Sequence, residues 1–141
     1  MERDTLLRRE EEAWRDFAGV IAAVPDARRE AEGVVPGWSP HDLLWHCAYW
    51  VDFTGGVLEK VRGGDADPEG GQPPEEDILA EGRRTSWDQA IARAEAGRER
   101  ARSALSAFDD DPIPELAAQW FREDTFEHYD EHAEQIRAFN V

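Results

Sequence analysis

The stretch Gly37-Trp38-Ser39-Pro40-His41-Asp42-Leu43-Leu44-Trp45-His46 carries a clear signal for the start of a helix. Ser39 is a good N-cap. Pro40 suits the first helical position, where the backbone N–H that proline lacks would have no partner within the helix. Asp42 places a negative charge in the first turn, near the positive end of the helix dipole. Apolar residues then recur at helical spacing to about Val61, where Gly63-Gly64 ends the pattern. The stretch predicts a long helix that contains a histidine, His46. The pair Gly55-Gly56 inside it either weakens the helix or permits close packing.

Helical periodicity marks three further segments on either side of this helix. They are residues 3–24, a segment that starts after a Thr85 or Ser86 cap and runs to about Phe108, and residues 114–139. A short helical turn is expected around residues 75–81, after a loop over residues 63–74 that is rich in glycine and proline. No sustained alternation of apolar and polar residues indicates a strand. We therefore predict an all-α fold, a four-helix bundle that forms one domain over residues 1–141.

The connection lengths predict the topology of the bundle. A second helix of about 22 residues is about 33 Å long, and the connection from Gly63 to Thr85 is long enough to recross that distance. The other connections are shorter and suit antiparallel neighbours. The expected order is up-down-down-up, with a long crossover between helices two and three. In that order the second and last helices run antiparallel, which brings His46, His128 and His132 to a similar depth in the bundle.

The three histidines are the candidate metal ligands. His128 and His132 lie four residues apart on one helix face, a spacing that binds zinc in other helical sites. The bare spacing is equally consistent with two solvated histidines. However, the pair is aligned with apolar residues of the last helix, and neutral histidines in a core need partners for their ring nitrogens. A lone His46 would be a satisfied core residue; beside the pair it is expected to be the third ligand.

Three neutral nitrogens would hold a divalent metal ion (Zn, Ni or Fe) with its full charge and at least one open position. Catalytic metal sites keep such a position, whereas structural zinc sites are usually closed. The second N–H group of each ligand histidine should donate to an oxygen. The sources considered for that oxygen are Glu12, Asp16, Asp52, Glu131 and Gln135.

The remaining histidine, the cysteine, the tryptophans and the acidic run are expected to have structural roles. His41 is expected at the surface or at the rim of a pocket, and Cys47 as a small core residue. Trp45, Trp50 and Trp120 could wall a pocket near the histidines, but we favour the interpretation that they fill the bundle. The acidic run Glu10-Glu11-Glu12 is expected to be solvated surface.

Composition narrows the classes of partner. The chain has 16 Lys and Arg against 32 Asp and Glu, a formal net charge of −16. Such a chain repels phosphate backbones and anionic membrane surfaces, so we expect no nucleic-acid or membrane partner. One cysteine excludes an internal disulfide, and no secretory signal follows Met1. These features favour a cytoplasmic protein.

Two motifs resemble those of DinB/YfiT-like proteins. The first is residues 37–46, similar to the family pattern W-S-x-x-D-x-x-x-H, and the second is residues 125–136, similar to H-Y-x-x-H-x-x-Q-I. The resemblance implies an up-down-down-up bundle, a three-histidine metal site on His46, His128 and His132, and a homodimer. Characterised members include the N-terminal domain of mycothiol-dependent maleylpyruvate isomerase and bacillithiol transferases, in which the metal is thought to activate a low-molecular-weight thiol.

The leading functional hypothesis is therefore a metal-dependent thiol S-transferase or detoxification enzyme that acts on a small electrophile. Hydrolysis by a metal-bound hydroxide is the second hypothesis. A non-catalytic, stress-related binding protein is the third.

Overall fold

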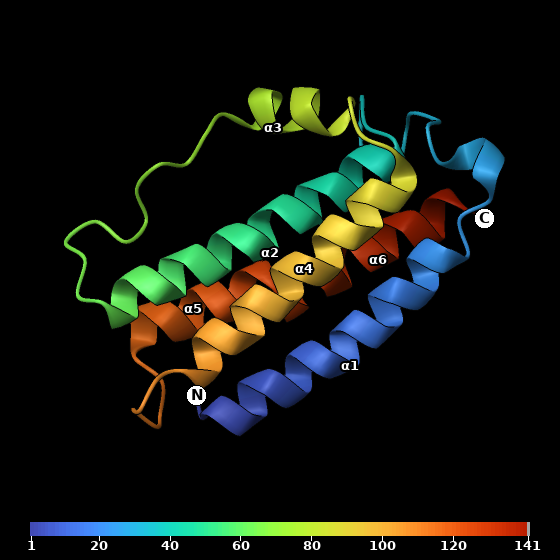
Figure 1. Cartoon of the computed structure of the whole chain (residues 1–141). Helices are drawn as coiled ribbons and strands as arrows, with labels where there is room; N and C mark the ends of the chain where they lie inside the picture. Colours follow the sequence, from blue (N-terminus) through green and yellow to red (C-terminus); the bar gives the residue numbers. More distant parts are fainter. Residues whose placement is uncertain (141) are drawn as a thin grey trace.

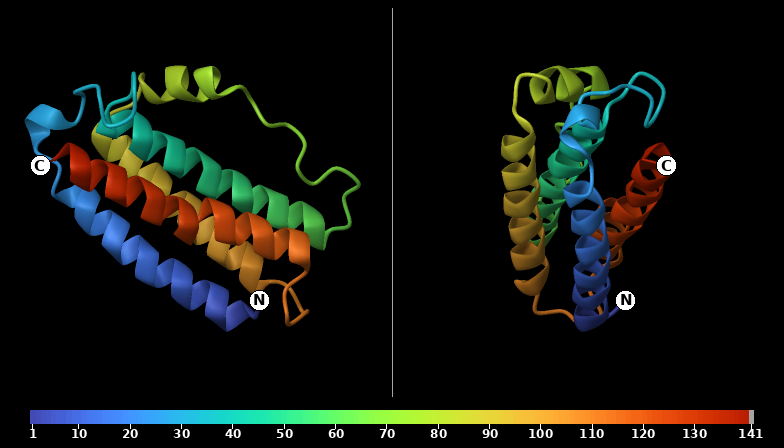
Figure 2. Two further views of the ribbon diagram at one scale, coloured as in Figure 1. Left: turned by 180° about the vertical axis from the view of Figure 1, so that it is seen from behind. Right: turned by 90° about the vertical axis from the view of Figure 1, so that its right-hand side faces the viewer.

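The computed structural model describes residues 1–140 and contains helices joined by loops (Figure 1). After the first long helix comes a single 3₁₀ turn, Asp26–Arg28. The helices are α1 Arg3–Ala22, α2 Pro40–Arg62, α3 Glu75–Gly82, α4 Trp87–Ser106, α5 Glu115–Asp124 and α6 Phe126–Phe139. Helices α2 and α4 run in the same direction and pack on each other, while α1 packs on α6 and both run the opposite way (Figures 1 and 2). The predicted all-α, up-down-down-up bundle is confirmed.

Both long central helices begin with a reciprocal cap. The Ser39 hydroxyl accepts from the backbone N–H of Asp42, and the Asp42 carboxylate accepts from the backbone N–H of Ser39. Ser86 and Gln89 make the same pair of bonds at the start of α4. Each cap satisfies two backbone donors that a helix otherwise leaves free. The start predicted for α2 is thus confirmed, and Ser86 is the cap of α4.

The crossover between α2 and α4 spans the length of the bundle, as Figure 1 shows in green and yellow. It leaves α2 at Gly63, runs back without helix to Pro74, and forms α3 at the end where α2 began. Ile78, which is 1% exposed, anchors α3 to the bundle. The crossover therefore lies along the side of α2, where it can contribute residues to a site on that helix.

The last helix is not continuous, contrary to the expectation for residues 114–139. It is broken at Thr125, whose backbone angles (φ −115°, ψ −97°) are not helical. Thr125 is fully buried, and its hydroxyl donates to the carbonyl of Phe121 one turn earlier. A threonine that bonds this carbonyl competes with the helical ladder and bends the helix. The break lies between α5 and the helix that carries both paired histidines.

Small residues bring α2 and α4 unusually close. A Cβ atom on Gly97 would lie 3.0 Å from both the backbone nitrogen and the Cβ of Asp52. A Cβ atom on Gly55 would lie 2.8 Å from Cγ of Arg100. The glycine pair of α2 therefore serves close packing, one of the two alternatives that the sequence left open.

A buried carboxylate ties three helices together. Glu10 of α1 is 0% exposed and accepts hydrogen bonds from Arg98 and Arg102 of α4, with closest distances of 2.8 Å to each. The phenol of Tyr129 on α6 donates to the same carboxylate at 3.2 Å. The expectation that residues 10–12 form a solvated surface is wrong for Glu10, because its position on the helix faces inward. A carboxylate survives burial only when it is paired and hydrogen-bonded in this way.

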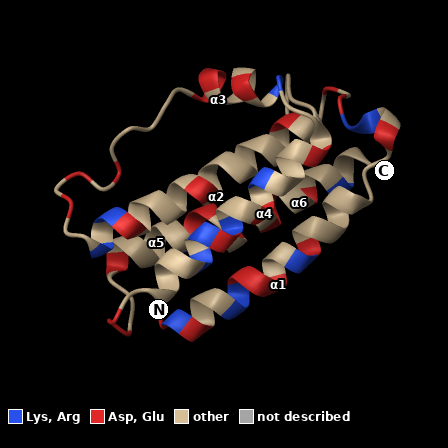
Figure 3. Cartoon of the chain, in the orientation of Figure 1, with Lys and Arg blue, Asp and Glu red and all other residues tan. Residues whose placement is uncertain are grey.

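The outer faces of the helices carry the charge of the chain (Figure 3). Acidic and basic residues alternate on the visible faces of α1 and α4, whereas the crossover and α3 are mostly acidic. Within residues 1–140, no helix combines the length and the apolar character needed to cross a membrane.

The close approach of α2 and α4 predicts a large penalty at Gly97. Replacing Gly97 with valine should lower the free energy of unfolding by about 2–3 kcal/mol, because its side chain must push α2 away. Gly19 in α1 is the control, since nothing lies within 4 Å of a Cβ placed there. Gly19→Ala should raise stability by about 0.5–1 kcal/mol through helix propensity. Urea unfolding of both variants measures the difference, and equal effects would exclude tight packing at Gly97.

The buried ion cluster predicts a contrast between two glutamates of the same run. Glu10→Leu should cost about 3 kcal/mol of stability, because it leaves two guanidinium groups partly buried without their carboxylate. Glu12→Leu should change stability by less than about 0.5 kcal/mol, since the Glu12 side chain is 68% exposed. Thermal and urea unfolding of the two variants provide the measurement. A similar loss in both would mean that Glu10 is solvated after all.

Candidate metal centre

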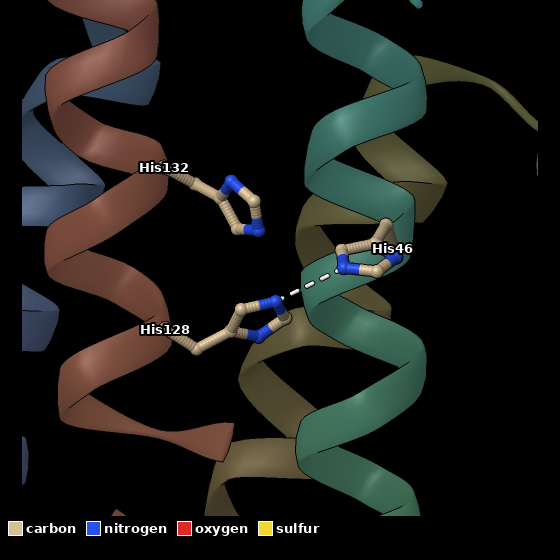
Figure 4. A group of neighbouring side chains, drawn as sticks. All are labelled: His46, His128 and His132. Carbon is tan, nitrogen blue, oxygen red and sulfur yellow. Dashed lines mark hydrogen bonds between the residues drawn. The ribbon is translucent and has the colours of Figure 1, made fainter. Parts of the chain in front are cut away.

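The structure brings His46, His128 and His132 together between α2 and α6 (Figure 4). One nitrogen from each ring lies within 4.8 Å of the others. Nε2 of His46 is 3.0 Å from Nε2 of His128, and the rings of His128 and His132 have centroids 4.4 Å apart. The four-residue spacing on α6 stacks two rings on one face, and antiparallel α2 supplies the third at the same depth. The sequence-predicted grouping of these three side chains therefore exists in the folded chain.

Two of the rings are held from behind by side-chain oxygens. Nδ1 of His46 lies 2.5 Å from Oε1 of Glu75, and Nδ1 of His132 lies 2.6 Å from Oε1 of Gln135. An N–H at each Nδ1 donates to that oxygen, which leaves the lone pair of Nε2 facing the other rings. This arrangement orients imidazoles for metal binding and fixes their tautomer.

Buried nitrogens without partners show that the cluster is chemically incomplete. Nε2 of His132 and Nδ1 of His128 have no hydrogen-bond partner within residues 1–140. Burial, followed by the neighbouring imidazoles, lowers the pKa of His128 to about 2, and burial also lowers the pKa of His132. Both rings are therefore neutral at physiological pH, the form that binds a metal. Three imidazole nitrogens within reach of one another, one of them buried without a partner, fit a late divalent metal ion.

An open cleft of about 360 Å³ leads to two of the histidines. It is lined by His46, Trp50, Gln72, Glu75, Trp120, Asp124 and His128. Glu75 uses its second oxygen to accept from the indole N–H of Trp50 at 3.3 Å, so this carboxylate joins the wall of the cleft to the histidine cluster. A small molecule in the cleft would lie beside His46 and His128.

Asp124 is the carboxyl group of this cleft whose pKa is shifted by its surroundings. It ends α5, four residues before His128. Burial, reinforced by the neighbouring carboxylate of Glu123, raises the pKa of Asp124 to about 7. A carboxyl group with such a pKa exchanges protons near neutral pH, which is the property required of a general acid or base.

Other sequence-based expectations have mixed outcomes. Cys47 is a buried core residue, as predicted. His41 is buried, contrary to the expectation of a surface position: its Nδ1 lies 2.6 Å from Glu30 and its ring packs near Trp87. The interpretation of tryptophans as bundle filler holds for buried Trp45. It fails for Trp50 and Trp120, because both line the cleft.

Sequence reasoning missed two residues of the site. Of the five side chains considered as partners for the ligand histidines, Gln135 contacts His132, whereas Asp16 and Asp52 pair with arginines. Glu75 was not considered, because it lies 29 residues from His46 and no local pattern connects them. Asp124 did have a signal: it precedes His128 by the same four residues that separate His128 from His132.

Comparisons with known proteins show the family and agree with the fold. The model of one family, the DinB superfamily, matches residues 10–136. A crystal structure of a protein from Streptococcus pneumoniae superposes with a TM-score of 0.71 at 11% sequence identity, over 99% of this chain and 91% of that one. At this identity the likeness shows the fold alone. No curated protein matches the sequence.

The contact between Glu75 and His46 predicts an effect on metal affinity. Glu75→Ala should weaken Zn²⁺ binding about 10- to 100-fold, because the ring of His46 loses the group that orients it. Glu75→Gln retains an oxygen acceptor and should lose less. The exposed neighbour Glu76 is the control, and Glu76→Ala should leave the affinity within about twofold. Competition with a chromophoric zinc chelator measures all three variants, and equal affinity in Glu75→Ala and Glu76→Ala would contradict the assigned role.

Proposed function

This chain belongs to the DinB superfamily, and from that premise we propose that it is a cytoplasmic, metal-dependent thiol S-transferase that acts on small electrophiles. His46, His128 and His132 hold the divalent metal ion in this proposal, and the cleft beside them receives the substrates. The observation that carries it is the buried Nε2 lone pair of His132, which faces the other two rings without a partner among the described residues. A closed structural site would offer a fourth protein ligand, and no fourth carboxylate, thiol or imidazole of residues 1–140 joins this group.

When bound, a divalent metal at three histidines acts as a Lewis acid that lowers the pKa of a thiol or water molecule beside it. The residues of the chain supply the remaining functions. Glu75 and Gln135 hold two of the imidazole rings in orientation. Trp50 and Trp120 form apolar parts of the cleft wall against which a substrate lies. The carboxylate of Asp124 is placed to accept the thiol proton, while the sulfur forms a bond to the electrophilic carbon and the leaving group departs with its electron pair.

Hydrolysis is the second candidate, and Asp124 is the observation that favours it. A carboxyl group with a pKa of about 7 beside a metal site can accept a proton from water as well as from a thiol. The two reactions differ in one requirement, because hydrolysis continues after every thiol has been removed. The homodimer implied by the family resemblance is part of the proposal for either reaction.

The first test is the metal content of the purified protein, measured by elemental analysis beside the His128→Ala/His132→Ala double variant. We expect about one divalent metal ion per chain in the parent protein and none in the variant. The metal-loaded protein should then consume model electrophiles such as 1-chloro-2,4-dinitrobenzene faster with added thiols than without them, and the double variant should lose this acceleration. The absence of metal in both proteins after incubation with Zn²⁺ or Ni²⁺ would refute the proposal. Activity that survives removal of thiols would favour the hydrolase.

A further inference from the structure

The cleft beside the histidine cluster has a lining of unusual composition. Besides the two histidines, it contains two indole rings, two carboxylates and one amide, from Trp50, Trp120, Glu75, Asp124 and Gln72. None of these lining residues is lysine or arginine. No hydrogen bond or ion pair of the Asp124 carboxylate is found within residues 1–140, although burial raises its pKa. The cleft thus holds a carboxylate that lacks a cationic partner.

Both indole N–H donors of the cleft are already in use. The indole N–H of Trp50 donates to Glu75 at 3.3 Å, and that of Trp120 donates to Glu69 at 2.6 Å. The side-chain amide of Gln72 donates to the backbone carbonyl of Glu69. An anionic ligand would therefore meet few free donors here. Both indole rings line the cleft and are only partly buried, although each also packs against Phe53. A carboxylate at the N–H edge makes each ring more electron-rich, which favours a cation over an anion beside it.

The segment that covers this side of α2 is acidic throughout. Residues 63–82 contain seven Asp and Glu side chains and neither Lys nor Arg. Figure 3 shows the crossover and α3 in red and tan, with blue only beyond α3. The carboxylates of Glu69 and Glu75 reach from this segment to the tryptophans of the cleft. Together with Asp124 they bring three carboxyl groups to the cleft: Glu75 and Asp124 line it, and Glu69 bonds to Trp120 beside it. With a pKa of about 7, Asp124 is partly ionised at neutral pH, and a bound cation favours its charged form.

We propose that the cleft selects ligands that carry a positive charge beside an apolar group, as in an aryl ammonium compound. The apolar group lies against Trp50 and Trp120, and the cation lies between the ring faces and Asp124. Indole faces attract cations, and attraction is stronger where water is partly excluded. The ion pair gives Asp124 the charged partner that it lacks within the described chain. Anionic ligands are disfavoured by the three carboxylates and by the occupied N–H donors.

This inference rests on the proposed function, since it takes the cleft to be the place where the substrate lies. It narrows the substrate class. A thiol or electrophile that carries an amino group fits the lining, whereas a thiol rich in carboxylates does not. The preference for cationic ligands depends on residues other than the three histidines. It can therefore be measured as a binding constant, without any enzymatic activity.

Three probes of similar size separate the effect of charge from that of shape. Benzyltrimethylammonium is a cation without a lone pair for the metal, benzyl alcohol is neutral, and benzenesulfonate is an anion that coordinates metals poorly. Ligand-observed NMR titration of the zinc-loaded protein at constant ionic strength gives the three dissociation constants. We expect the cation to bind at least about tenfold more tightly than the sulfonate, with the alcohol between them. Equal or tighter binding of the sulfonate, or no binding of the cation, would overturn the inference.

Asp124→Asn and Glu123→Gln form a matched pair of variants. Each removes one negative charge from adjacent residues, but Glu123 is exposed and does not line the cleft. Asp124→Asn should weaken binding of the cation about fivefold to tenfold and leave the alcohol unchanged. Glu123→Gln should change either constant by less than about twofold. Equal losses in the two variants would assign the preference to the net charge of the chain and overturn the proposed site.

The metal content of the same sample separates this inference from the proposed function. A sample that takes up no metal but keeps the preference for the cation, and loses it in Asp124→Asn, refutes the proposed function and supports the cleft. A sample that contains metal but shows no preference for the cation refutes the inference about the cleft and leaves the proposed function standing.

Discussion

The carboxylate of Glu10 is the contact on which the orientation of the site depends. Its burial is tolerable only while Arg98, Arg102 and Tyr129 stay bonded to it, so it fixes how α1, α4 and α6 sit against one another. Tyr129 follows His128 directly and points about 100° away around α6. Holding the phenol on Glu10 therefore turns His128 toward α2 and His46. The buried ion cluster around Glu10 thus helps to set the direction in which the His128 ring points.

The topology of the bundle gives the crossover a second role. Because α2 and α4 run in the same direction, the chain must return along the whole bundle before α4 can begin. That return passes beside α2 and α5 and brings Glu69, Gln72 and Glu75 to the cleft. The bundle helices thus supply the three histidines and the two tryptophans, while the crossover adds Gln72 and, at the first residue of α3, Glu75. Changes in such a connection can alter what the cleft accepts without disturbing the histidine cluster.

Local signals predicted most of the helices and the grouping of the three histidines, because caps, periodicity and loop lengths are readable without the folded chain. Glu10 was misjudged although the signal was present, since it falls on the inward stripe between Leu6 and Ala13. The break at Thr125 needs a side-chain bond to Phe121 that propensity alone does not give. Glu75 lay beyond prediction, because its contact with His46 spans 29 positions that include the loop of residues 63–74, whose path no local pattern gives.

The histidine cluster and the acidic crossover place different requirements on the chain. Bringing three imidazoles together between α2 and α6 requires only the bundle fold and two helices that carry histidines. The pneumococcal protein has the same fold at 11% sequence identity. Neither requirement explains why residues 63–82 contain carboxylates and no basic side chain. Surface charge in excess of need destabilises a fold through self-repulsion. Glu69 and Glu75 are each bonded to a tryptophan of the cleft, which indicates that some of these charges serve the lining and not solubility alone. The proposed selection of ligands therefore depends on the crossover, whereas the proposed metal site depends on the histidines.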